Sequence, residues 1–204
     1  MLDAKNAGTK AKLVSVLVAG GLILAVALLA LRVAPTTVWA HVVPSPCDFT
    51  TGGGFVFKDD GNRVNFGIVG GCKNGGFFGH VNVVDHGFDP PGHLNGPVTA
   101  YFDPFPNGPS GYRDLCGTGR LNDGSTVQYR IRTKDNGEPG SLDRFGIKVA
   151  AIGYIVSTRD LGPPGPTDGG GNIQLHKPNP STTGPANPPD EITACGGDDS
   201  GLGQ

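Results

Sequence analysis

The amino-acid sequence predicts an all-β protein, an antiparallel β-sandwich or small barrel of eight to nine short strands preceded by an N-terminal apolar export helix. Three observations predict this class. After residue 40, apolar and polar residues alternate with a period of two, and no segment keeps the helical period of 3.6. Gly, Asn and Asp turns separate these segments at the spacing of a sandwich or barrel. Gly (35 of 204 residues) and Pro (18) punctuate the segments, which argues against disorder over most of the chain.

The N-terminal 40 residues have the composition of a secretory signal. Three lysines precede the apolar run 13–31, and a small-residue motif ends at Ala40. We predict a signal peptide that is exported by the general secretion route and cleaved after Ala40, with Pro35 ending its helix. The run is also long enough for a membrane anchor, so this second fate stays open. In both cases the rest of the chain is secreted or at the cell surface, and it meets the membrane only through this segment.

Alternation identifies the strands of a predicted β-sandwich domain at 47–177, each with one apolar and one polar face. In the strand 125–133, Val127, Tyr129 and Ile131 are expected to face the core, and the residues between them, Arg130 and Arg132 included, to face solvent. The predicted strands, in order, are 55–58, 63–69, 77–86, 98–102, 115–122, 125–133, 144–149, 154–158 and 172–176.

The connections have turn chemistry. Residues 59–62 (Asp-Asp-Gly-Asn) and Asp123-Gly124 predict tight hairpins, because Gly and Asx residues accept the positive φ that such turns require. Glycine triplets at 52–54 and 169–171 open the first and last strands, and we expect these two strands to lie close together. Residues 178–204 are predicted to be a Pro- and Gly-rich tail that has little to bury.

The four cysteines lie after the export segment and are expected to form disulfides in an oxidising compartment. No two of them have the spacing of a metal or redox motif, so neither a metal site nor a cofactor is predicted. Cys47 and Cys195 flank the whole strand region. We therefore predict the pairs Cys47–Cys195 and Cys72–Cys116, the first of which would pin the tail at Cys195.

Charge excludes one class of partner. Without residues 1–40, 12 basic and 17 acidic residues remain, a net charge of 12 − 17 = −5. Nucleic acids and anionic membranes both bind basic surfaces, so neither is expected as a partner. A cell-surface protein or a polysaccharide is consistent with this charge.

No catalytic set of residues is recognisable, and the protein is predicted not to be an enzyme. His80 and His86 share a strand face but are about 20 Å apart at the rise of a strand, too far to hold one metal. The acidic turns 59–62 and 135–143 could offer oxygens to calcium, although turns are rich in Asp and Asn for backbone reasons alone. Calcium dependence is left open.

An aromatic loop is the one candidate binding feature. Residues 101–112 contain Tyr101, Phe102, Phe105 and Tyr112 in a loop that three prolines stiffen. Aromatic faces beside polar groups suit sugar rings or a partner protein. Alternatively, the same rings cover the core beneath the loop.

Several segments together resemble a known family. One group comprises 47–51 (Cys-Asp-Phe-Thr-Thr), the strand 63–71, Phe78-Gly79-His80 and Val84-Asp85-His86, and the other comprises 135–140, Asp143-Arg144-Phe145 and 169–178. Over roughly residues 49–178 the chain is similar to the post-COAP-1 domain. That resemblance implies an exported bacterial β-domain of unassigned activity, and its motifs are strand and turn signatures rather than a chemical site.

The sequence thus predicts an exported structural or adhesive β-domain that uses exposed strand edges and the 101–112 loop for contact. One alternative is a carbohydrate-binding accessory domain that uses the same aromatic residues. Another is an enzyme of a type that the sequence does not reveal.

Overall fold

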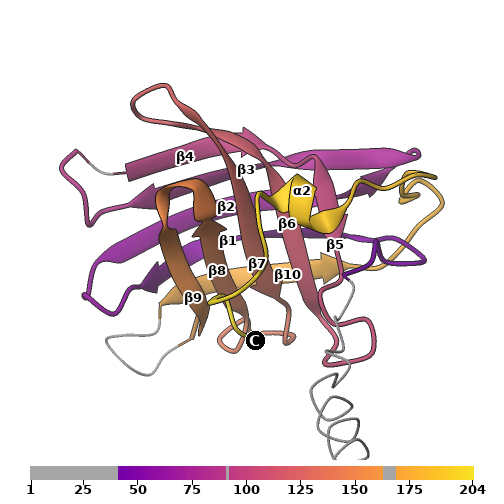
Figure 1. Ribbon diagram of the computed structural model, residues 1–204. Helices are drawn as coiled ribbons and strands as arrows, with labels where there is room; N and C mark the ends of the chain where they lie inside the picture. The colour runs from indigo at the N-terminus through magenta and orange to yellow at the C-terminus, as the bar shows by residue number, and fades with distance from the viewer. Residues whose placement is uncertain (1–40, 91, 163–168) are drawn as a thin grey trace, which may run out of the picture. The chain divides into compact units, whose positions relative to one another are not determined.

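A computed structural model describes residues 41–90, 92–162 and 169–204, and Figure 1 shows how their strands are arranged. The apolar run 13–31 and the predicted cleavage site after Ala40 lie outside the described residues. No helix in the described part of the chain is long and apolar enough to span a membrane.

The predicted all-β antiparallel class is confirmed, but the strands form one curled sheet, a half-barrel. Nine strands follow the order β10-β1-β2-β3-β4-β6-β7-β8-β9, and β5 pairs with β6 beside this path. In Figure 1 the strands β6 to β9 pass in front of β1 to β4. The strands are β1 (Phe49–Phe57), β2 (Arg63–Lys73), β3 (Gly76–Asp85), β4 (Gly92–Pro97), β5 (Ala100–Phe102), β6 (Tyr112–Leu121), β7 (Thr126–Lys134), β8 (Arg144–Val149), β9 (Tyr154–Asp160) and β10 (Gly170–His176).

The core fills the concave side of the sheet with the apolar residues of the alternating strands. Phe66 of β2 stacks on Phe145 of β8 with ring centroids 3.9 Å apart, so the two halves of the curl meet there. The same layer includes Val56, Val64, Ile68, Val81, Val83, Leu115, Tyr129, Ile131, Ile147, Val156 and Ile173. Burial of this many side chains is the main free-energy gain of the fold.

Two glycines allow close approach within the curl. A Cβ atom at Gly70 of β2 would lie 2.7 Å from the Leu115 side chain, so a larger residue there would force that side chain to move. A Cβ atom at Gly54 of β1 would lie 2.2 Å from the Gly170 carbonyl oxygen of β10. The expected closeness of the first and last strands is confirmed, since β1 and β10 pair antiparallel along their length.

The hairpin turns also agree with the sequence. The β1–β2 turn closes with the Lys58 amide donating to the Asn62 carbonyl (2.9 Å), and Gly61 has a φ of 80°. In the β6–β7 turn, Gly124 has a φ of 83°. The strand β4 was not predicted, because its sequence (Gly-His-Leu-Asn-Gly-Pro) has a single large apolar residue and no alternation to detect.

The free edge of β10 is covered by carboxylates from the β7–β8 loop. The Ile173 amide donates to Asp143 (2.7 Å) and the Leu175 amide donates to Asp135 (2.7 Å). These two side chains therefore stand in for a neighbouring strand at an edge that would otherwise be open to pairing with another chain. This gives the acidic 135–143 loop a structural role that requires no cation.

The predicted tail is packed rather than free. A short helix, α2 (Glu191–Cys195), and the residues after it cover the outer face of β5, β6 and β7, in front of the sheet in Figure 1. Leu202, near the C-terminus, is fully buried, and the Thr158 amide of β9 donates to its carbonyl oxygen (2.7 Å). We call residues 190–204 the C-terminal strap.

The cysteine pairing predicted from the sequence is wrong. The structure joins Cys47 to Cys72 and Cys116 to Cys195, in place of Cys47–Cys195 and Cys72–Cys116. The antiparallel register of β1 and β2 places the residues just before β1 opposite the end of β2, which brings the first two cysteines together. Cys195 ends α2, which packs against β6 and so reaches Cys116. The tail is pinned at Cys195, but to the middle of the sheet.

Candidate functional site

An apolar cavity of about 650 Å³ lies on the concave side of the sheet, between β3 and β4 on one side and β8 and β9 on the other. The side chains that line its depth are almost entirely apolar. They come from four strands: Val83 of β3, Leu94 of β4, Leu121 of β6, and Ile147 and Val149 of β8. We call this space the pocket.

The pocket lies where β6 and β8 end beside the beginning of β4. The β4–β6 pairing joins Leu94 to Leu121 and Asn95 to Arg120, and β6 itself ends at Leu121. The first residues of β4 therefore extend past the end of β6, while β8 ends in a one-turn 3-10 helix, η1 (Ala150–Ile152). The apolar inward faces of the strands are left facing a space that no described side chain fills.

One buried polar group stands inside the pocket. Asp85, at the end of β3, is only 3% exposed. The Tyr154 hydroxyl donates to its Oδ2 (2.8 Å), the Gly87 amide donates to its Oδ1 (2.7 Å), and Lys58 Nζ lies 3.0 Å from Oδ2. A buried carboxylate needs such partners, and here three donors satisfy it.

The same contacts shift the protonation of the neighbouring groups. Burial, followed by the hydrogen bond to Asp85, raises the pKa of Tyr154, so this hydroxyl keeps its proton at neutral pH. Burial tends to lower the pKa of Lys58, but the hydrogen bonds to Asp85 and Asp60 outweigh it and raise the pKa above its ordinary value. Asp85 thus forms an ion pair with Lys58 and accepts a hydrogen bond from Tyr154.

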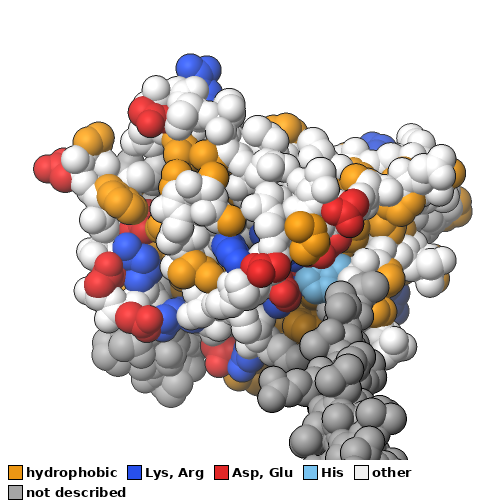
Figure 2. All heavy atoms as spheres, in the orientation of Figure 1, with side chains coloured by type: hydrophobic (Ala, Val, Ile, Leu, Met, Phe, Trp, Pro, Cys, Tyr) orange, Lys and Arg blue, Asp and Glu red, His pale blue; other side chains and the backbone are white. Residues whose placement is uncertain are grey.

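The mouth of the pocket combines exposed apolar residues with carboxylates. Phe88 is 53% exposed and Ile152 is 56% exposed, high values for residues of this type. Asp89 and Asp123 are exposed lining residues. Figure 2 shows hydrophobic side chains on the upper left of the molecule, in the region where β4 begins and β8 ends, with acidic side chains near them.

The aromatic loop predicted to contact a ligand is part of the core instead. Tyr101, Phe102 and Tyr112 are all at most 2% exposed, so they have no free face for a sugar ring. Phe105 is half-buried and packs edge-on against Tyr112, with ring centroids 5.0 Å apart, under the guanidinium of Arg132. The alternative, that these rings cover the core, is the one that the structure supports.

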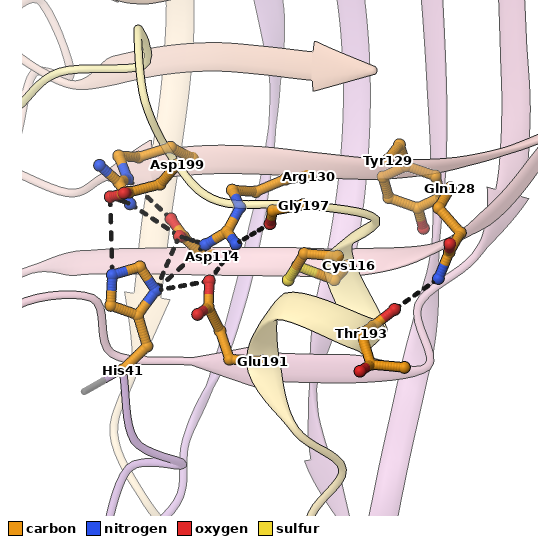
Figure 3. Close-up of a disulfide and its surroundings, with 12 residues drawn as sticks. His41, Asp114, Cys116, Gln128, Tyr129, Arg130, Glu191, Thr193, Gly197 and Asp199 are labelled. Atoms are coloured by element: carbon orange, nitrogen blue, oxygen red, sulfur yellow. Dashed lines mark hydrogen bonds and ion pairs between the residues drawn. A yellow bond between two sulfur atoms is a disulfide. The ribbon is translucent and has the colours of Figure 1, made fainter. Parts of the chain in front are cut away.

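A second correction concerns Arg130 and Arg132, which were expected to face solvent but are each 1% exposed. Both point away from the core, as the alternation predicts, but the C-terminal strap covers them. Figure 3 shows this for Arg130, and Arg132 donates to the Gly203 carbonyl of the strap (2.8 Å). Asp114, fully buried, accepts hydrogen bonds from Arg130 Nη1 (2.9 Å) and Arg132 Nε (2.8 Å). Arg130 also donates to the Gly197 carbonyl (2.8 Å) of the strap.

Further acidic groups and a histidine complete this charged cluster. Arg130 forms an ion pair with Glu191, and Arg132 with Asp199 (2.8 Å). His41 lies between the two strap carboxylates, with Nδ1 3.0 Å from Glu191 and Nε2 3.5 Å from Asp199. The cluster joins the strap to the sheet, and its carboxylates are all paired with the arginines or with His41.

The pKa of His41 reflects this position. Burial alone would lower the pKa, but hydrogen bonds to Asp199 and Glu191, with the charge of Asp114, raise it from 6.5 to about 9. His41 is therefore a cation at neutral pH.

The remaining candidate residues do not converge. His86 hydrogen-bonds Asn65 (3.1 Å), and His93 hydrogen-bonds Asn82 (2.9 Å), on the outer side of the sheet. Within the described ranges, no three His, Cys, Asp or Glu side chains are grouped closely enough to hold a metal ion.

Comparison of the chain with protein-family models, with curated protein sequences and with solved structures found no match. The sequence analysis did not identify the pocket, although Val83 and Asp85 fall within its predicted strand 77–86 and Ile147 and Val149 within its predicted strand 144–149. Two signals were present in the sequence. Phe88 lies in a loop just before two prolines, and Asp85 ends a strand face that is otherwise apolar.

Proposed function

We propose that this chain is an extracytoplasmic binding domain that holds a small, largely apolar molecule in the pocket. The observation that supports this most is the cavity itself, about 650 Å³ and lined mainly by Val, Leu and Ile. Ligand sites are concave, mostly apolar and furnished with a few placed polar groups, and Asp85 with Tyr154 supplies those groups here. The apolar walls of this pocket would gain free energy when a ligand removes them from water.

The exposed side chains at the mouth support the same proposal. Phe88 and Ile152 flank the opening of the pocket, and a ligand bound there would cover both side chains. Burying apolar surface contributes roughly 25 cal/mol per Å², so covering both side chains would add measurably to affinity.

Binding fits the groups of the pocket better than catalysis does. Asp85 is the one carboxylate buried there, and all its contacts are to donors that fix its charge in place. A general base needs a lone pair within hydrogen-bond reach of the proton that it removes, and the donors around Asp85 occupy its oxygens. We therefore keep the interpretation that the domain is not an enzyme.

The compartment and family remain part of the proposal. Two disulfides, with no free cysteine among the described residues, favour an oxidising compartment outside the cytoplasm. Export through the N-terminal segment and membership of the post-COAP-1 family are consistent with a disulfide-bonded β-domain. The curled sheet leaves room for a ligand on its concave side.

A neutral fluorescent probe, N-phenyl-1-naphthylamine, tests the pocket directly. We expect saturable fluorescence enhancement with the wild-type chain, and at least about tenfold weaker binding in the Phe88→Ser/Ile152→Ser variant, because two apolar walls of the mouth are lost. The matched control is Leu142→Ser/Ile192→Ser. These two apolar residues are exposed to a similar degree (63% and 48%) but lie outside the pocket. Equal binding by both variants would contradict the proposal.

A second candidate function is adhesion to a polysaccharide through the outer face of β10, β1, β2 and β3. There Phe49 stacks on His176, with ring centroids 4.2 Å apart, and Phe78 lies 6.0 Å from Phe49. Between them, Thr51 hydrogen-bonds His176 (2.8 Å). Half-buried aromatic rings beside hydroxyl and imidazole groups are suited to sugar rings.

Retention on insoluble cell-wall polysaccharide tests this second candidate. We expect Phe78→Ala, which removes one ring of the group, to elute earlier than wild type if the face binds glycans. The pocket variant Phe88→Ser/Ile152→Ser should elute with wild type and serves as the control. No retention of the wild-type chain would exclude this candidate and leave the pocket unaffected.

A further inference from the structure

Negative side chains outnumber positive ones around the pocket, and this excess indicates the class of its ligand. Three carboxylates are among the lining residues, those of Asp85, Asp89 and Asp123, and the lining contains no lysine or arginine. The charges therefore distinguish between apolar molecules that differ only in the polar group they carry.

The buried carboxylate is already neutralised. Lys58 approaches Asp85 from outside the lining, with Nζ 3.0 Å from Oδ2, and stays beside the Phe88 ring, 5.4 Å from its centroid. This ion pair offsets the negative charge of Asp85. Because Lys58 is held there and also contacts Asp60 (3.2 Å), it is not free to meet an anionic ligand.

The two carboxylates at the mouth, those of Asp89 and Asp123, have no ion-pair partner among the described residues, although the Arg120 guanidinium lies close to Gly124 in the same turn as Asp123. In the described part of the chain, the ion pairs near this end of the sheet join Lys58 to Asp60 and Asp85 and Arg159 to Asp59, and none reaches Asp89 or Asp123. Asp123 accepts hydrogen bonds from the Ser125 amide and hydroxyl, which fix its position and leave it charged. Hydrogen bonds to the ionised carboxylate lower its pKa.

The remaining basic side chain of the lining is His93, whose Nε2 lies 2.9 Å from the Asn82 amide oxygen. The mouth thus combines negative charge with the exposed apolar side chains of Phe88 and Ile152.

From this arrangement we infer that the ligand is a cationic amphiphile, with an apolar body in the pocket and an ammonium-type head between Asp89 and Asp123. The inference rests on the proposed function, since it assigns a chemistry to the ligand of the same pocket. A fatty-acid anion of equal length would place its carboxylate beside two others of the same sign, which is unfavourable. A neutral alcohol of that length would gain the apolar contacts alone.

Displacement of N-phenyl-1-naphthylamine by three decyl compounds tests the inference. The compounds are decylammonium, decanol and decanoate, used below the concentrations at which they form micelles. They share one apolar body and differ in the charge of the head. We expect decylammonium to bind at least about tenfold more tightly than decanoate, with decanol between them, from the interaction of unit charges near a protein surface. The difference should shrink at high salt, because the mouth is exposed to solvent.

Two variants separate local charge from overall charge. Asp89→Asn/Asp123→Asn should bring the three affinities together while decanol binding stays as in wild type. Asp190→Asn/Asp198→Asn removes the same total charge from exposed positions in the C-terminal strap, outside the pocket, and should leave the preference intact.

The outcomes distinguish the inference from the proposed function. Equal or tighter binding of decanoate, or a preference that persists in Asp89→Asn/Asp123→Asn, overturns the cationic assignment and leaves an apolar pocket in place. If the probe binds and none of the three compounds displaces it, the cationic assignment also fails. If the probe itself does not bind, both the proposed function and the inference fail.

Discussion

At the residue scale, the most consequential side chain outside the pocket is Asp114, which lies fully buried between two buried arginines. Arg132 contacts it through both Nε and Nη2, each at 2.8 Å, and Arg130 through Nη1. A buried charge is tolerated only when it is paired, so the stability of the strap side of the sheet depends on this carboxylate.

We expect Asp114→Asn to lower the free energy of unfolding by about 3–5 kcal/mol, because two buried guanidinium groups lose a shared counter-ion. Urea denaturation followed by circular dichroism measures this loss. The matched control is Asp198→Asn, since Asp198 is an exposed partner of Lys148 and exposed pairs contribute little. A loss at Asp114 no larger than at Asp198 would show that the buried cluster is not needed for stability.

His41 makes the stability of the chain depend on pH. Its pKa is raised from 6.5 to about 9 in the folded state, so the folded state holds the proton more tightly than the unfolded state. The stabilisation is therefore complete below about pH 6.5 and is lost as the pH rises through about 9, with a total of up to about 3 kcal/mol.

The test compares wild type with His41→Gln across this range of pH. Wild type should lose stability relative to the variant between pH 6.5 and pH 9.5, because glutamine cannot be protonated. Subtracting the variant removes the contribution of other titrating groups. Parallel curves of unfolding free energy would mean that His41 is not held by Asp199 and Glu191 as described.

At the element scale, the C-terminal strap shows why the arginines of β7 could not be placed from the sequence. Alternation assigns Arg130 and Arg132 correctly to the face opposite Tyr129 and Ile131, because the latter two belong to the core while both arginines donate to the strap. What alternation cannot reveal is that residues 190–204 return to cover that face. The Pro-rich segment before the strap has few apolar residues, and the strap binds through carboxylates and backbone carbonyls rather than an apolar stripe.

The disulfide of the strap gives an element-scale prediction. Cys116→Ser/Cys195→Ser should lower the free energy of unfolding by up to about 4.5 kcal/mol, because the bond closes a loop with a sequence separation of 79. Limited proteolysis should then cleave within 190–204 before the sheet unfolds. Probe binding should persist, since the pocket is on the concave side. If the strap of the variant resists proteolysis as well as that of wild type, the disulfide at Cys195 is not needed to hold the strap on the sheet.

The other disulfide was within reach of the sequence. The hairpin turn at 59–62 was identified correctly, and its register alone places Cys47 beside the end of β2, where Cys72 lies. The prediction failed because it relied on the positions of the cysteines at the ends of the strand region instead of extending the hairpin register back to Cys47.

At the scale of the whole molecule, the alternating strands and Gly-rich turns were sufficient to predict the antiparallel all-β class and the neighbouring of β1 and β10. They could not show that all strands join one sheet, because β4, the strand that links the two halves, has no periodic signal. The pocket follows from that same link. It depends on where β4 and β6 stop pairing, a feature of register that residues far apart in sequence decide together.

The central claim is that the pocket, and not another face, binds small apolar molecules. The most direct measurement is a titration of the isotope-labelled chain with N-phenyl-1-naphthylamine, followed by amide chemical shifts in two-dimensional NMR. We predict saturable shifts confined to residues around the pocket, among them Gly92, Leu94, Ile147, Val149 and Ile152. Shifts on the outer face of β1 to β3, or no saturable shifts at any amide, would contradict it.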